Sequence, residues 1–250
     1  MRHLHFQEYQ NCMSERDSAC LHLCRARGFF DDQGCLGEAF DQEYFEYGIL
    51  TGKSLYYRYR WMPDLSSSLA RAVIQLAELC PAHSILDFGS AKGFLVKALR
   101  RLDMLAWGCD ISQYAISHVD PEVKAYCRPC GDVRIIPFDR QFDVCISKDV
   151  FEHIDTFALD IVLRCIGQRC VNMVAIVPLG DNGKFNIREY HLDVTHRIAQ
   201  SEKWWARKFR RNGWTVLDFR HAVDGIKDNW AAKHPRANGI FVLTTRSRDS

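Results

Sequence analysis

Long apolar runs are absent from this sequence, and so is an excess of charge of one sign. The longest apolar stretch, Met173 to Leu179, is far shorter than the roughly 20 residues that cross a bilayer. Basic residues number 33 and acidic residues 31, a balance that does not by itself predict binding to nucleic acid or to a membrane surface. The first residues, Met1 to Glu8, contain no apolar segment of a secretory signal, so we expect a cytoplasmic protein.

The composition is that of a folded globular protein. Of 250 residues, 47% are hydrophobic and 12% aromatic, which is enough for a sizeable core. The 11 cysteines are an odd number, and without an export signal we interpret them as reduced thiols. Cys20 and Cys24 form one short pair near Cys12, His22 and Cys35, whereas a structural zinc site usually has two close pairs. We therefore assign no metal ligands.

The chain divides into two regions of different character. Residues 1–66 are rich in cysteine, aromatic and acidic residues without a clear period, and we expect an aromatic-rich helical lid or substrate lobe there. Residues 67–250 alternate short apolar runs with amphipathic segments, which indicates an α/β domain. The expected strands are Ser84–Phe88, Met104–Cys109, Val123–Cys127, Phe142–Ser147, Val171–Pro178, Val216–His221 and Gly239–Thr245. The expected helices are Ser67–Cys80, Phe94–Arg101, Ser112–His118, Thr156–Gln168 and Ser201–Arg211.

The segment between the last two strands, residues 222–238, shows little helical periodicity. It predicts a long hairpin rather than a crossover helix, so the last strand should run antiparallel to its neighbour.

A glycine-containing turn joins the first strand of this domain to a helix. Asp87 ends the strand, and Gly89, Ser90 and Gly93 follow it. Glycine lets the chain turn sharply and lets a ligand approach the backbone, while the helix N-terminus offers free N–H groups. The spacing is not that of a dinucleotide-binding turn, and an acidic strand end repels pyrophosphate. The turn therefore favours a cationic ligand.

Two more blocks extend this predicted site. Asp110, followed by Ile111, ends the second strand about 20 residues after Gly89, where a carboxylate can accept both hydroxyls of a ribose. Asp132 could accept the amine of an adenine, and the Val133 amide could donate to its ring. Lys148, at the end of the fourth strand, completes the predicted cofactor-binding set.

Together these blocks resemble the class I S-adenosylmethionine-dependent methyltransferases over about residues 84–246. Asp87, Gly89 and Gly93 match the first motif of that family, Asp110 its ribose-binding acid, and Asp132-Val133 its adenine contact. Ala91 departs from the pattern, since glycine is commonest there. The resemblance implies a Rossmann-like seven-stranded mixed sheet with an antiparallel last strand, and S-adenosylmethionine as methyl donor.

The same resemblance extends to the stretches that would hold the acceptor. Phe142-Asp143 opens the family's fourth strand, and Glu152-His153-Ile154 resembles a sequence frequent after it in the small-molecule branch. The Asp-x-Thr-His pattern at Asp193–His196, before a Trp-Trp helix, resembles methyltransferases of glycan synthesis.

Histidines are the candidate catalytic residues, because a hydroxyl acceptor needs a general base. His153 follows the fourth strand, and His191, Asp193 and His196 lie in a long polar segment, residues 180–200. The latter three could form a base with an orienting carboxylate or part of a metal site. Alternatively, Asp193 caps a turn and the histidines are solvated.

The acceptor itself remains open at this level. Residues 41–63 combine many aromatic rings with Arg58 and Arg60, which favours a lid whose rings stack on a sugar or adenine, or simple docking of the lobe. The basic residues of 203–211 are typical of a solvated helix face. We expect O-methylation of a saccharide or other small molecule and rank nucleic acid or protein acceptors below it. A non-catalytic cofactor-binding subunit is the third possibility, and the oligomeric state is not indicated.

Overall fold

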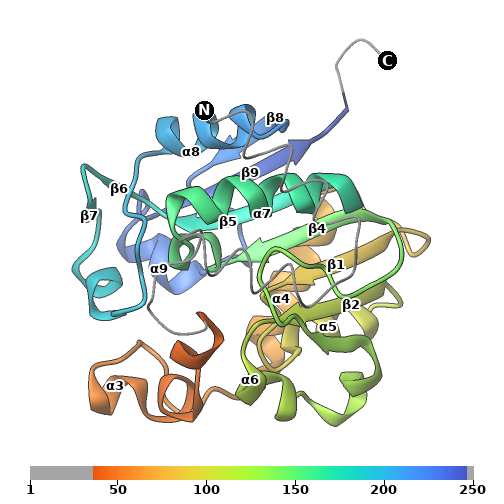
Figure 1. Cartoon of the computed structure of the whole chain (residues 1–250), viewed down its shortest axis with the longest axis horizontal. Helices are drawn as coiled ribbons and strands as arrows, with labels where there is room; N and C mark the ends of the chain where they lie inside the picture. Colours follow the sequence, from red (N-terminus) through yellow and green to blue (C-terminus); the bar gives the residue numbers. More distant parts are fainter. Residues whose placement is uncertain (1–35, 247–250) are drawn as a thin grey trace, which may run out of the picture. The chain divides into compact units, whose positions relative to one another are not determined.

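A seven-stranded sheet organises the part of the chain that this computed structural model describes, residues 36–246. Its strand order is β3-β2-β1-β4-β5-β9-β8 (Figure 1). The strands are β1 (Ser84–Phe88), β2 (Leu105–Asp110), β3 (Cys127–Pro129), β4 (Phe142–Lys148), β5 (Cys170–Pro178), β8 (Thr215–Arg220) and β9 (Asn238–Thr244). Strands β3 to β5 are parallel, whereas β9 is antiparallel to both β5 and β8. The predicted mixed sheet and its antiparallel last strand are confirmed.

Helices cover both faces of the sheet because successive strand residues point to opposite sides. In β1, Ile85 packs with residues of two helices on one face, and Leu86 packs with residues of two others on the opposite face. The first pair is α4 (Pro63–Leu76) and α5 (Phe94–Arg100), and the second is α7 (Thr156–Arg169) and α8 (Glu202–Arg211). The remaining α-helices are α3 (Gly48–Thr51), α6 (Gln113–Ser117) and α9 (Asp228–Lys233).

Most predicted boundaries agree with the structure to within two residues, and side-chain caps explain why. Ser201 precedes α8 and accepts a hydrogen bond from the Trp204 amide, and Asp155 caps α7 in the same way. Helix α4 begins earlier than predicted, because Pro63 suits the first helical position, where no N–H is needed. Helix α9 was not predicted.

The predicted third strand, Val123–Cys127, is wrong. Residues Pro121–Tyr126 form the 3-10 helix η3, and only Cys127–Pro129 forms β3. Asp120 caps this turn by accepting the Glu122 amide, and Pro121 starts it. The apolar Val123 is buried in the helical turn rather than in a strand.

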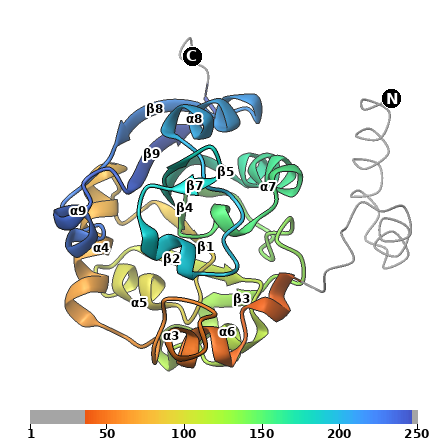
Figure 2. The same ribbon diagram turned by 90° about the vertical axis from the view of Figure 1, so that its left-hand side faces the viewer.

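Short elements surround the carboxyl end of the sheet. The chain enters through η1 (Leu36–Ala39) and the π-helix η2 (Glu43–Tyr47), whose Phe45 stacks on Tyr114 of α6 (Figure 2). After β4 comes η4 (Phe151–His153), and after β5 come β6 (Gly180–Asp181), β7 (Lys184–Phe185) and η5 (Arg188–Leu192). The long segment after β5 is therefore a small hairpin followed by a helical turn.

Some predictions fall on residues outside the described part of the chain. The cysteine group of residues 12–35 lies there, as does most of the predicted 1–66 lobe, so its boundary stays a prediction. The described cysteines are all free thiols. Among residues 36–246, no helix is long and apolar enough to cross a membrane.

Candidate active site

The turn after β1 is built to bring the backbone close to its surroundings. Gly89 has a φ of +83°, and its amide donates to the Cys109 carbonyl at 2.8 Å. A Cβ atom on Gly89 would lie 2.3 Å from a methyl group of Val150, so no side chain fits there without displacement. Gly93 is also left-handed and begins α5, with Lys97 donating back to its carbonyl. Ala91 adopts a φ of +46°, which explains why glycine is common at this position.

Asp110 ties this turn to the end of β2. One carboxylate oxygen accepts the Ala91 amide at 2.7 Å, and the other accepts the Ser112 amide at 2.7 Å. Each oxygen keeps a further lone pair, so the carboxylate can still accept hydroxyl groups. Burial raises the pKa of Asp110, and the two amide donors oppose that rise. The predicted ribose-binding position is thus a fixed carboxylate.

Asp87 lies at the end of the neighbouring strand and is buried. Burial raises the pKa of Asp87 to about 7, the charge of Asp110 raises it further, and Lys148 opposes the rise. Two carboxylates share this edge of the sheet, so the edge attracts a cation and repels an anion.

Asp132 has a partner that the sequence did not indicate. Its carboxylate forms an ion pair with Arg134, whose Nε lies 2.7 Å and 3.0 Å from the two oxygens. The Cys130 amide donates to the Asp110 carbonyl at 2.8 Å, which places this loop beside the end of β2. Val133 packs against the core. The predicted adenine contact would therefore have to share its carboxylate with a guanidinium group.

Lys148 is held in a charge network at the end of β4. Its Nζ lies 2.6 Å from Asp149, and Lys227 pairs with the other oxygen of the same carboxylate. Burial alone would raise the pKa of Asp149, but the two lysines hold it well below its usual range. Lys227 also donates to the hydroxyl of Tyr190 and to Asn238, both at 3.1 Å. The predicted cofactor contact, Lys148, thus has a carboxylate partner of its own.

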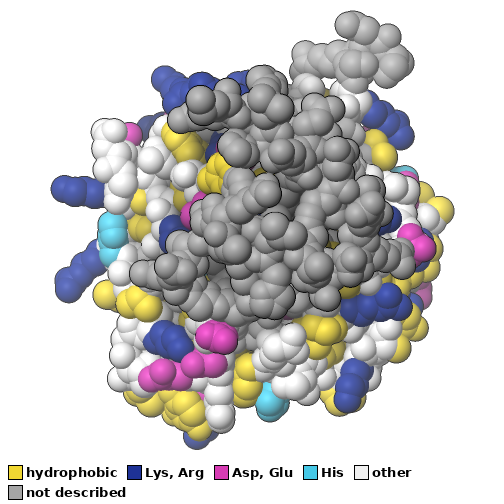
Figure 3. Space-filling view, in the orientation of Figure 1, with side chains coloured by type: hydrophobic (Ala, Val, Ile, Leu, Met, Phe, Trp, Pro, Cys, Tyr) yellow, Lys and Arg dark blue, Asp and Glu magenta, His cyan; other side chains and the backbone are white. Residues whose placement is uncertain are grey.

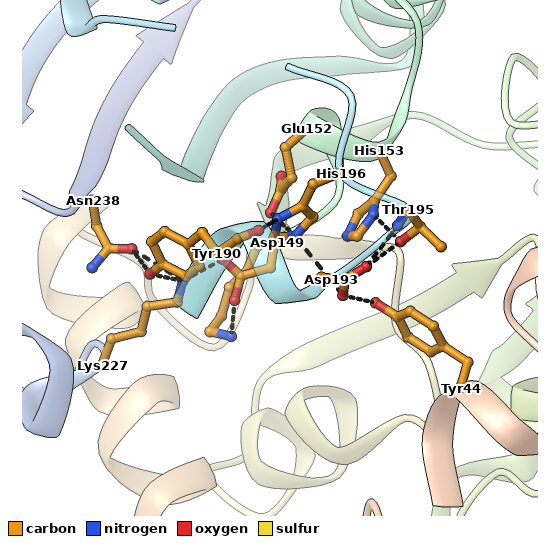
Figure 4. A network of polar contacts seen from close by, with 11 residues as sticks. Tyr44, Asp149, Glu152, His153, Tyr190, Asp193, Thr195, His196, Lys227 and Asn238 are labelled. Carbon is orange, nitrogen blue, oxygen red and sulfur yellow. Dashed lines mark hydrogen bonds and ion pairs between the residues drawn. The ribbon is translucent and has the colours of Figure 1, made fainter. Parts of the chain in front are cut away.

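A second cluster follows β4 and consists of Glu152, His153 and His196 (Figure 4). Glu152 is completely buried, and neither of its carboxylate oxygens has a hydrogen-bond partner. The nearest oxygen lies 3.9 Å from Nε2 of His196, and the two imidazole rings are 4.7 Å apart. Because the Glu152 carbonyl accepts the amides of Arg197 and Ile198, the segment carrying His196 is fixed against η4.

Hydrogen bonds fix how both imidazoles present their nitrogen atoms. Nδ1 of His196 lies 2.7 Å from the Tyr190 carbonyl, which can only accept, so Nδ1 carries the proton. The Thr195 hydroxyl donates to Asp193 and therefore accepts from Nδ1 of His153 at 2.8 Å. In both neutral rings the free lone pair consequently sits on Nε2.

Burial keeps this cluster free of protons on its imidazoles and favours a proton on its carboxyl group. It lowers the pKa of His153 to about 4, with His196 contributing, and it also lowers the pKa of His196. The pKa of Glu152 is raised well above its usual range by burial and by the charge of Asp149. The interpretation of solvated histidines is wrong for His153 and His196, since His153 is buried and the His196 side chain is only 7% exposed.

Asp193 and His191 have different surroundings. Asp193 caps a turn through the Thr195 amide at 3.0 Å, and its second oxygen accepts the Tyr44 hydroxyl at 2.9 Å. Both predicted roles thus apply, because Asp193 caps a turn and, through Thr195, orients His153. His191 is exposed, and its Nε2 accepts the Phe185 amide at 3.0 Å, so that nitrogen cannot act as a base.

Aromatic residues of the N-terminal segment link the two groups of charges. Burial raises the pKa of Tyr59 to about 12, and Asp87 and Asp110 contribute. Burial also raises the pKa of Tyr56 well above its usual range, with contributions from Tyr59 and from the carboxylates of the second cluster. The rings of Tyr56 and Tyr59 are 4.9 Å apart. This aromatic wall therefore borders both the glycine turn and the histidine cluster.

Several participants were missed from the sequence. Glu152 was quoted only as part of a motif, and Tyr44, Arg134 and Lys227 were not singled out. Acidic residues inside an apolar motif, such as Glu152 between Phe151 and His153, are the one local signal that was available.

Comparisons with known proteins agree with this geometry. Residues 86–166 match a family model described as a methyltransferase domain. No curated protein matches the sequence. An S-adenosylmethionine-dependent methyltransferase from Clostridium acetobutylicum is similar in structure, with a TM-score of 0.54 and 12% identity over 76% of this chain and 94% of its own.

Two further solved structures show the range of reactions associated with this fold. One is 1,6-didemethyltoxoflavin-N1-methyltransferase from Burkholderia thailandensis, solved with that substrate and S-adenosylhomocysteine (TM-score 0.55, 15% identity, 74% of this chain and 80% of its own). The other is the cyclase SpnF (TM-score 0.54, 14% identity, 71% and 80%). Such identities show a shared fold, and a fold alone does not fix the reaction.

Proposed function

We propose that this chain, which has the fold of the class I S-adenosylmethionine-dependent methyltransferases, binds S-adenosylmethionine and transfers its methyl group to an oxygen of a saccharide or other small molecule. The observation that carries the donor assignment is the pair of carboxylates, Asp87 and Asp110, beside the Gly89 turn. S-adenosylmethionine is a cation with a ribose, and this edge offers negative charge and a fixed hydroxyl acceptor.

The residues fit this donor in three ways. Gly89 provides a place where the backbone can be approached, since a Cβ atom there would collide with Val150. Asp110 is held by two amides and can accept ribose hydroxyls. Asp87 can neutralise the ammonium or sulfonium charge. Asp132 has to share its carboxylate with Arg134, so we expect its replacement to weaken donor binding less than that of Asp87 or Asp110.

The reaction asks little covalent chemistry of the protein. The sulfur–methyl bond breaks as the oxygen–methyl bond forms, leaving S-adenosylhomocysteine, a methyl ether and one proton. The chain has to align the acceptor, exclude water and take up that proton. We place the acceptor hydroxyl against Glu152, His153 and His196, where two unprotonated imidazole nitrogens are available. Asp193 acts through Thr195 as a positioning residue.

A small acceptor is favoured over nucleic acid by the distribution of basic side chains. Lysine and arginine side chains lie at separate points around the part of the face that Figure 3 draws in colour. On α8, Lys208 pairs with Asp160 at 2.7 Å, while Arg207 and Arg211 point to solvent. That pattern is typical of a solvated helix face. We expect no salt-sensitive binding to oligonucleotides.

The test is transfer of a labelled methyl group from S-adenosylmethionine to pooled saccharides and hydroxylated metabolites. We expect a labelled ether product from the native chain and at least a tenfold lower rate at low donor concentration from Asp110→Asn. Asp218→Asn, a change of an exposed residue of β8, should leave the rate unchanged. A native chain that transfers label only to oligonucleotides or proteins would contradict the proposed acceptor class.

A further inference from the structure

We propose that Glu152, His153 and His196 bind one divalent metal ion of the zinc and manganese class, through one carboxylate oxygen and the two Nε2 atoms. The three potential ligand atoms lie within 4.8 Å of one another, and Nε2 of His196 is 3.9 Å from the nearest oxygen of Glu152. Ligands at ~2.1 Å from a common ion are about 3 to 4 Å apart. A small rotation of the side chains is therefore enough to close the site.

The carboxylate of Glu152 is the observation that asks for a cation. It is completely buried, and neither oxygen has a hydrogen-bond partner. Buried carboxylates are almost always paired or bound to a metal. The two nearby lysines, Lys148 and Lys227, are both engaged by Asp149. A cation between Glu152 and the imidazoles supplies the missing partner without disturbing that network.

The surroundings of both histidines are those of metal ligands. A ligating imidazole typically donates its second nitrogen to a carbonyl or to a carboxylate, which fixes the ring. His196 donates to the Tyr190 carbonyl at 2.7 Å. His153 donates to Thr195, which donates to Asp193, and Asp193 also accepts from Tyr44 (Figure 4). Each Nε2 is thereby left unprotonated for a ligand, as neutral imidazole ligation requires.

The ligand types select the ion. Two imidazoles with one carboxylate suit zinc, manganese, iron or cobalt better than magnesium or calcium, which prefer oxygen ligands throughout. Three protein ligands leave positions open, as in catalytic rather than structural sites. In the part of the inference that rests on the proposed function, the open side faces the acceptor, and the ion lowers the pKa of its hydroxyl in place of a histidine base.

Metal titration of the full-length chain without methyl donor tests the site. The protein is stripped with a chelator and titrated with Zn²⁺, Co²⁺, Mn²⁺ and Mg²⁺ by calorimetry, and Co²⁺ is also followed by visible absorption. We expect at least tenfold weaker binding of Zn²⁺ and Co²⁺ by Glu152→Gln and by His196→Gln. His118→Gln, a change of an exposed histidine of α6, should bind like the native chain.

Two readings keep the result clear of other causes. Cysteines of residues 1–35 could hold metal too, so the site is counted as the difference in bound metal between the native chain and Glu152→Gln. Circular dichroism melting and donor affinity of each variant establish that it is folded. Equal metal binding by the native chain and both variants, no binding at all, or Mg²⁺ binding as tight as Zn²⁺ would overturn the proposal. Because no donor is present, failure here leaves the proposed methyl transfer standing.

Discussion

The carboxyl edge of the sheet holds two groups of charges that are satisfied in opposite ways. At the glycine turn, Asp110 is bound by two backbone amides. Beyond β4, Glu152 has no partner on either oxygen, and both neighbouring imidazoles present a free Nε2. The first group is fixed before any ligand arrives, whereas the second lacks a positive charge. This difference suggests a rigid donor site beside an acceptor site completed by another component.

The largest effect should come from filling the glycine turn. Gly89→Ala places a methyl group 2.3 Å from Val150 at a φ of +83°, so we expect loss of at least 2 kcal/mol of folding stability and most of the donor affinity. Gly52 is the matched control, since it has a similar φ of +75° but open space around its Cβ position. Thermal melting and donor titration of both variants measure the contribution of the close approach.

In the Gly52→Ala variant we expect only the backbone cost of about 1 kcal/mol and unchanged donor affinity. Similar losses of donor affinity in the two variants would mean that the Gly89 turn is not a ligand-binding feature.

A smaller effect should follow from the protonation of Asp87. Its pKa of about 7 means that the carboxyl group is neutral in acid and anionic in base. Affinity for a cationic donor should therefore rise with pH, by up to about tenfold per unit below pH 7, and level off above it. Calorimetric titrations between pH 5.5 and pH 8.5 test this profile.

Folding stability without donor should change in the opposite sense. The folded-state pKa of Asp87 is raised above its ordinary 3.8, so its contribution is fully present below pH 4 and is lost as the pH rises through 7. Asp87→Asn should flatten both profiles. A pH dependence of donor affinity that survives in this variant would assign it to another group.

The smallest effect should come from the support of the second cluster. Tyr44→Phe removes one hydrogen bond to Asp193 at 2.9 Å, which is worth about 1 kcal/mol. We expect a several-fold lower kcat for methyl transfer with unchanged affinity for S-adenosylmethionine. If the donor affinity fell and kcat did not, Tyr44 would belong to the donor site, and the division between the two groups would fail.

The two groups also differ in how far the sequence predicts them. The strand, turn and helix of residues 84–100 are contiguous, so Asp87, Gly89 and Gly93 could be assigned from local pattern alone. Glu152 becomes buried and unpartnered only because the segment after η5 binds its carbonyl, a contact between residues 45 positions apart. The pairing of Asp149 with Lys227 spans 78 positions. Such contacts follow from the topology of the sheet and leave no periodic trace in the sequence.

The misplaced third strand has a similar origin. The apolar residues Val123 and Cys127 suggest a strand, but Asp120 and Pro121 start a helical turn whose core contact is with Gly93. Asp120 is bound to Lys97 of α5 at 2.8 Å, so tertiary contacts reinforce the local cap. Cap and proline therefore outweigh the short apolar pattern.

Calorimetric titration of the purified chain with S-adenosylmethionine and S-adenosylhomocysteine tests the central claim most directly. Our account predicts one binding event per chain for each ligand, weakened at least tenfold by Asp110→Asn and left unchanged by Asp218→Asn. No heat of binding with either ligand from a folded native chain, or equal affinity in Asp110→Asn, would contradict it.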